Sequence, residues 1–114
     1  MLEAFWKSLK SGTDIRGAAM ENDLGEPVRL TDEAVRRMAG GFLCWMQEHL
    51  GLAAGAKIAL GHDSRLSGER IADALADVFV KKGVTVYDCG LASTPSMFMA
   101  VLDLPCDAAV QITA

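Results

Sequence analysis

The chain has 114 residues, of which 51% are hydrophobic and 23% charged, so it has the length and composition of one globular domain and not of a disordered segment. Its formal net charge of −4, from 11 basic and 15 acidic residues, gives no reason to expect a nucleic acid or an anionic membrane surface as partner. The apolar runs are far shorter than the roughly 20 residues that a membrane-spanning helix needs, so we expect no membrane association.

The first 50 residues predict two helices separated by a polar stretch. A short helix is expected over about the first ten residues. Residues 11–17 (Ser-Gly-Thr-Asp-Ile-Arg-Gly) predict a loop, and residues 21–27 predict turns. Thr31 is a suitable N-cap for a helix over residues 32–50 that Gly51 would end. The Gly40-Gly41 pair disfavours a helix, and close packing against another element could explain its presence here.

Two strand–helix units follow. Residues 57–60 are a short apolar run that predicts a buried strand, and residues 61–66 form the loop after it. Ser67 is expected to cap the next helix, which has an apolar stripe made of Ile71, Leu75, Val78 and Phe79.

The second unit begins with the β-branched run of residues 84–88, which predicts a strand. A loop over residues 89–94 leads into a helix that Thr94 would cap and Pro95 would begin. A third strand is expected over residues 107–113. The apolar positions of the last helix are Met97, Phe98, Val101 and Leu102.

This alternation of strand, helix, strand, helix and strand predicts an α/β fold. Crossovers of this length join parallel strands, so we expect a three-layer α/β/α domain around a mostly parallel sheet. Ligands of such sheets gather beyond the carboxyl ends of the strands. Because the third strand reaches Thr113 with nothing after it to cover this edge, we expect residues 1–114 to be a piece of a longer chain. A small complete protein is the alternative.

The three cysteines form no paired motif, so we expect reduced thiols in a cytoplasmic protein, packed as small buried hydrophobic side chains. His62 has no second histidine or cysteine at metal-ligand spacing, which gives no reason to expect a zinc site.

Three loops carry the polar side chains that could do chemistry. Glycines and Arg16 in residues 11–17 could approach an anion, although a surface turn with a solvated Asp14–Arg16 pair is the alternative. The loop at residues 61–66 lies between a strand and a helix N-terminus, where Asp63 could orient a site or only brace the loop. Ser93 and Thr94 suit helix capping better than catalysis.

These segments together resemble the α-D-phosphohexomutases, the family that includes phosphoglucomutase and phosphomannomutase. Residues 11–17 are similar to the family's N-terminal signature. Residues 61–68 (Gly-His-Asp-Ser-Arg-Leu-Ser-Gly) resemble its strand–loop–helix segment, and residues 90–95 (Gly-Leu-Ala-Ser-Thr-Pro) its second loop. The final Ile-Thr-Ala resembles the start of the phosphoserine loop, which typically continues Ser-His-Asn-Pro.

The resemblance implies that residues 1–114 are most of domain I of a four-domain enzyme and end just before the phosphoserine. Such an enzyme interconverts hexose 1-phosphate and hexose 6-phosphate through a phosphoserine and a hexose bisphosphate intermediate. The substrate would be a phosphosugar. The Mg²⁺ of the family is held by aspartates of the second domain, so this chain would hold no metal. The chain by itself is expected to be inactive.

The resemblance also assigns roles to single residues. Arg16 matches the arginine that contacts the transferring phosphate. Thr113 and Ala114 match the lead-in to the phosphoserine loop, while Thr13, Asp63 and Arg65 match segments that support the site.

Two other functions stay open. The first is a stand-alone anion- or nucleotide-binding α/β module, although neither GxGxxG nor GxxxxGK[ST] is present. The second is a non-catalytic interaction domain, in which an exposed edge strand could drive homodimerisation as a consequence of truncation.

Overall fold

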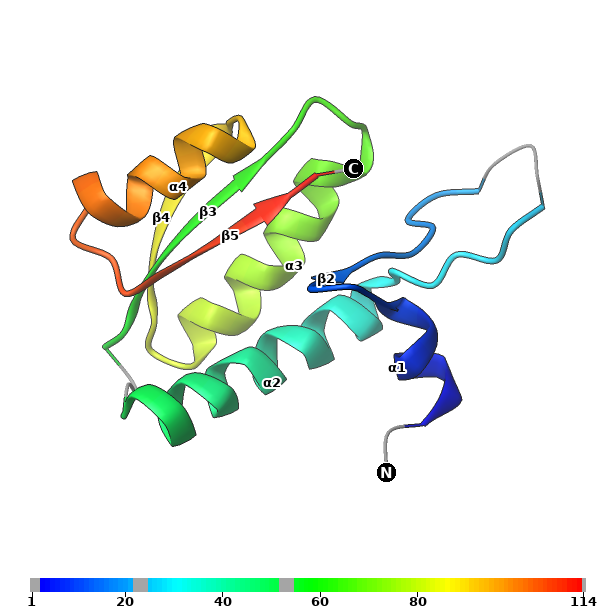
Figure 1. The fold of residues 1–114 in the computed structure, drawn as a ribbon, viewed down its shortest axis with the longest axis horizontal. Helices are drawn as coiled ribbons and strands as arrows, with labels where there is room; N and C mark the ends of the chain where they lie inside the picture. The colour runs from blue at the N-terminus through cyan, green and yellow to red at the C-terminus, as the bar shows by residue number, and fades with distance from the viewer. Residues whose placement is uncertain (1–2, 22–24, 52–54, 114) are drawn as a thin grey trace.

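The fold is built around a small parallel sheet, and a computed structural model describes residues 3–21, 25–51 and 55–113 (Figure 1). The sheet consists of β3 (Lys57–His62), β4 (Thr85–Leu91) and β5 (Ala108–Ile112) in the order β4-β3-β5. Both neighbours run parallel to β3. The carboxyl ends of all three strands therefore meet at one edge of the sheet.

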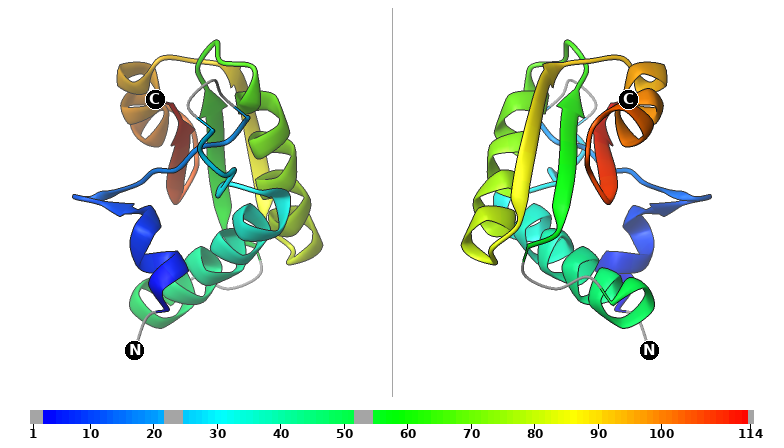
Figure 2. Two further views of the ribbon diagram at one scale, coloured as in Figure 1. Left: turned by 90° about the vertical axis from the view of Figure 1, so that its right-hand side faces the viewer. Right: turned by 90° about the vertical axis from the view of Figure 1, so that its left-hand side faces the viewer.

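Helices cover both faces of this sheet. The helices α2 (Asp32–Leu50) and α3 (Ser67–Lys81) lie on one side, and α4 (Thr94–Asp103) lies on the other (Figure 2). This arrangement confirms the predicted α/β/α domain. No helix in the described ranges has the length and apolar character needed to cross a bilayer.

The core lies between the central strand and the α2–α3 layer. The β3 side chains Ile58 and Leu60 are buried against Phe79 of α3 and Met46 of α2. Burying side chains of this size contributes about 2 kcal/mol each, so this layer supplies the main stabilisation of the fold.

The predicted bounds of α2 are confirmed at both ends. The Thr31 hydroxyl accepts a hydrogen bond of 3.2 Å from the Ala34 amide, and Gly51 ends the helix with a φ of 67°. The packing expected at Gly40-Gly41 is wrong, because a Cβ built at either glycine would meet nothing within 4 Å. Within the described structure, therefore, no neighbouring element packs so closely that it requires glycine at these two positions.

The N-terminal residues form a separate arm. The helix α1 (Ala4–Leu9) is followed by β1 (Lys10–Ser11) and β2 (Asp14–Ile15), which pair antiparallel. The loop predicted over residues 11–17 is thus largely a hairpin, and Gly12 permits its tight turn with a φ of 61°. Residues 22–24, part of the predicted turns, lie outside the described ranges.

Two strands extend beyond their predicted ends. β3 continues through Gly61 and His62, so the loop that follows begins only at Asp63. β4 begins at Thr85 and continues to Leu91, because its pairing with β3 resumes after a bulge that skips Cys89. The bulge keeps the two strands paired up to the edge where the polar loops lie.

Two predicted helix caps are wrong. Leu66 already has helical backbone angles, so α3 is entered without a side-chain cap and Ser67 is its first residue. Helix α4 is capped by Ser93, one residue before the predicted Thr94. The Ser93 and Ser96 side chains each accept a hydrogen bond from the other residue's amide, which forms a capping box.

Helix α4 buries only part of its apolar side chains. Met97 is buried, whereas Phe98 and Leu102 are 73% and 76% exposed.

The three cysteines are free thiols, but Cys44 is exposed and the other two are half-buried, so their predicted burial is wrong. Residues 107 and 113 lie just outside β5, which is two residues shorter than predicted.

Candidate functional site

The described site residues predicted from the sequence line one hollow. It has a volume of about 1170 Å³ and lies where the N-terminal arm faces the carboxyl edge of the sheet. Segments from three distant parts of the chain contribute to it. They bring together Thr13, Arg16, Asp63, Arg65 and Thr113. Ala114, the sixth predicted residue, lies outside the described residues.

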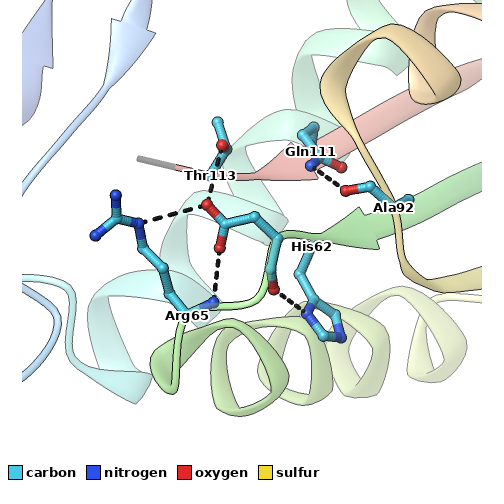
Figure 3. Close-up of polar contacts among 6 residues, drawn as sticks. His62, Arg65, Ala92, Gln111 and Thr113 are labelled. Atoms are coloured by element: carbon cyan, nitrogen blue, oxygen red, sulfur yellow. Dashed lines mark hydrogen bonds and ion pairs between the residues drawn. The ribbon is translucent and has the colours of Figure 1, made fainter.

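Asp63 connects the loop after β3 to the end of β5. Its carboxylate accepts a 3.1 Å hydrogen bond from the Thr113 hydroxyl and another of 3.1 Å from the Arg65 amide (Figure 3). The Arg65 guanidinium lies 3.5 Å from the same carboxylate. The Asp63 amide in turn donates to the Ile112 carbonyl at 2.9 Å. These bonds hold the loop after β3 against the end of β5.

Arg16 lies at the end of the hairpin and is fixed through its backbone. Its amide donates a 2.7 Å hydrogen bond to the Leu9 carbonyl. Its guanidinium is 3.3 Å from the Asp14 carboxylate, and both side chains are more than half exposed. An exposed pair of this kind contributes only about 0.5 kcal/mol to stability. Breaking this ion pair would therefore cost little free energy, so the Arg16 guanidinium is able to turn toward an anion in the hollow.

Gln111 is a residue near the site that sequence reasoning missed. Its side-chain amide donates a 3.0 Å hydrogen bond to the Ala92 carbonyl, which ties β5 to the loop before α4 (Figure 3). Its Oε1 atom is buried, with no hydrogen-bond partner within the described part of the chain. A lone glutamine in an apolar strand is the signal that could have identified it.

Small residues let the segments at this edge approach closely. A Cβ at Gly61 would lie 2.7 Å from the Met97 sulfur and 3.0 Å from Gln111 Oε1. A Cβ at Gly68 would lie 3.0 Å from the His62 ring. His62 is thus a packing residue whose Nδ1 lies 2.8 Å from the Asp63 carbonyl oxygen.

The described residues offer no metal site. Within residues 3–21, 25–51 and 55–113, no three His, Cys, Asp or Glu side chains converge as metal ligands would. These described residues therefore do not fit the Mg²⁺ that the resemblance implies.

The comparisons with known proteins agree on one family. The profile of phosphoglucomutase/phosphomannomutase, alpha/beta/alpha domain I, matches residues 8–114. The phosphoglucosamine mutase of Leuconostoc citreum is 33% identical over 106 residues, which are 90% of this chain and 21% of that protein. That of Deinococcus deserti is 35% identical over 94 residues, covering 72% of this chain and 21% of the relative. A probable phosphoglucosamine mutase of Thermococcus kodakarensis is 42% identical over 60 residues, covering 53% and 13% respectively.

The chain thus spans about a fifth or less of the length of these relatives. No solved structure gives a significant match. The family profile covers nearly the whole chain, including the β1–β2 hairpin, the loop after β3 and the end of β5. The chain belongs to the phosphoglucomutase/phosphomannomutase family of α-D-phosphohexomutases and corresponds to its α/β/α domain I.

Proposed function

We propose that the chain provides the phosphate-transfer side of a phosphosugar mutase that acts on glucosamine phosphate. The relatives described above are phosphoglucosamine mutases, which supports this substrate over other hexose phosphates. The reaction would move a phosphate between C1 and C6 of the sugar through a phosphoserine and a sugar bisphosphate. Any Mg²⁺ would be held by parts of the enzyme outside this chain.

One observation carries the proposal: Arg16 and the Asp63–Thr113 pair line the same hollow. A guanidinium at this position can donate hydrogen bonds to a phosphate oxygen and stabilise the negative charge there as the phosphate moves from the serine to a sugar hydroxyl. Asp63 holds the strand end from which the phosphoserine loop would continue. In this proposal Arg16 contacts the phosphate, and Asp63, Arg65 and Thr13 shape the site around it.

We further propose that residues 1–114 alone convert no sugar phosphate. The serine of the phosphoserine loop is expected directly after Ala114, so the hollow of this chain would contain the phosphate-binding arginine without the nucleophile. Purified chain that turned over glucosamine 6-phosphate, free of contaminating enzyme, would contradict this part of the proposal.

The proposal is tested by a graft. Residues 8–113 replace the matched segment in the Leuconostoc citreum enzyme, and formation of glucosamine 1-phosphate from glucosamine 6-phosphate is measured. We expect turnover, because this chain supplies Thr13, Arg16, Asp63, Arg65 and Thr113, and the rest of the relative would supply the phosphoserine loop. A graft that unfolds cooperatively but converts neither glucosamine, glucose nor mannose phosphate would contradict the proposal. Turnover of glucose or mannose phosphate alone would contradict only the choice of sugar.

A further inference from the structure

The segment between β2 and α2, which begins at Arg16 and is counted here with the arm, has little regular structure of its own. Between β2 and α2, the described residues of this segment belong to no helix or strand. Its two ends lie together, because the amides of Arg29 and Leu30 both donate to the Ala18 carbonyl, at 2.9 and 3.0 Å. The position of Arg16 relative to the sheet therefore depends on what holds these two ends to the body of the domain.

Arg70 of α3 makes that connection. One of its terminal nitrogens, Nη2, donates to the Ala19 carbonyl at 2.8 Å and to the Leu30 carbonyl at 3.0 Å. The other, Nη1, lies 2.5 Å from the carboxylate of Asp32 at the start of α2. One guanidinium thus bonds the outgoing end of the segment, its returning end and the helix that follows.

The geometry of a guanidinium suits this task. It is planar and carries several donors in fixed directions, so it can bond several acceptors at once without losing its charge. The Arg70 side chain is 36% exposed, which leaves these bonds partly shielded from water. Ala19 also packs against the core, so one residue that Arg70 binds is itself in contact with the body of the domain.

We propose that Arg70 is a positioning residue that docks the Arg16-bearing arm onto α3. Ala19 is three residues from Arg16, and α3 begins directly after the loop that carries Asp63 and Arg65. Arg70 thereby fixes Arg16 relative to the opposite wall of the hollow. The importance of this docking for phosphate transfer rests on the proposed function, whereas the docking itself does not.

Amide hydrogen exchange on the chain itself tests the docking. In Arg70→Met, which keeps an unbranched apolar side chain but none of the hydrogen-bond donors, we expect the Arg29 and Leu30 amides to exchange about tenfold faster. The amides of β3 should keep their rates. The Nε–H resonance of Arg16 should shift, since its surroundings change with the arm. Arg70→Lys should restore part of the protection.

Arg37→Met is the matched control, because Arg37 forms an exposed pair with Glu33 on its own helix. It should leave all these rates unchanged. Unaltered exchange of Arg29 and Leu30 in Arg70→Met would overturn the proposal. Equal acceleration in the arm and in β3 would also overturn it, since Arg70 would then only support global stability. A mutase graft without turnover would contradict the proposed function and leave this exchange result standing.

Discussion

The hydroxyl of Thr113 donates a hydrogen bond of 3.1 Å to Oδ2 of Asp63, fifty residues earlier in the chain. This bond joins the end of β5 to the loop after the central strand. Together with the bond from the Asp63 amide to the Ile112 carbonyl, it fixes the direction in which the chain leaves the sheet. In the proposed function, the phosphoserine loop would continue from this point.

We predict that Thr113→Val destabilises the domain by about 0.5–1 kcal/mol through loss of this bond. Asp63→Asn should cost more, because it also weakens the contact with Arg65. A double-mutant cycle in urea unfolding measures the coupling between residues 63 and 113. Independent effects of the two substitutions would show that the bond contributes nothing.

Gly61→Ala is predicted to destabilise the domain by about 1–3 kcal/mol, because its Cβ would lie 2.7 Å from the Met97 sulfur and 3.0 Å from Gln111 Oε1. The added Met97→Ala substitution should cost less in the Gly61→Ala background than in the wild type, since it removes the clashing sulfur. Urea unfolding of the four proteins measures this. A Gly61→Ala variant with wild-type stability would contradict the packing described for this edge.

Gly40→Ala and Gly41→Ala are predicted to stabilise the domain by about 0.5–1 kcal/mol each. A Cβ at either position meets nothing within 4 Å, and alanine reduces the conformational entropy of the unfolded chain. Thermal unfolding of the two single variants checks this. A lower melting temperature in either would indicate a close neighbour that the described structure lacks.

The α/β/α architecture and the bounds of α2 follow from local signals. Thr31, Asp32 and Gly51 occupy the positions that helix capping requires, and a run such as Lys-Ile-Ala-Leu identifies a buried strand by itself. The ends of β3 and β4 could not be predicted in this way. Gly61 and Gly90 are poor strand residues, and they pair only because two parallel strands continue side by side past a bulge.

The site residues divide in the same way, into those that the local sequence indicates and those that only the fold brings together. Arg16, Asp63 and Arg65 stand out because charged residues next to glycines mark loops. Arg70 does not stand out, because it is one of several charged residues of α3. Gln111 is the only polar residue of β5, which indicates a polar contact but not its partner. Their partners, Leu30 and Ala92, lie 40 and 19 residues away, and only the fold brings them together.

We predict that the ionisation of Asp77 makes the stability of the domain depend on pH in the acidic range. The hydrogen bond from Arg36, followed by that from Lys81, lowers the pKa of the Asp77 carboxyl below its ordinary 3.8. A carboxyl whose pKa is lowered by folding stabilises the native state above its unfolded pKa, and this contribution disappears as the pH falls through the folded pKa. Asp77→Asn should therefore lower the melting temperature at pH 7 but not well below pH 3.8. An equal reduction at both pH values would contradict this assignment.

The assignment of Arg16 to the transferring phosphate is the central claim, and the mutase graft carrying Arg16→Ala tests it most directly. We predict a fall in kcat/KM for glucosamine 6-phosphate of at least about 100-fold relative to the unsubstituted graft, with unchanged unfolding. The matched Arg37→Ala graft should keep full turnover, because Arg37 does not line the hollow. An Arg16→Ala graft as active as its parent would contradict the account.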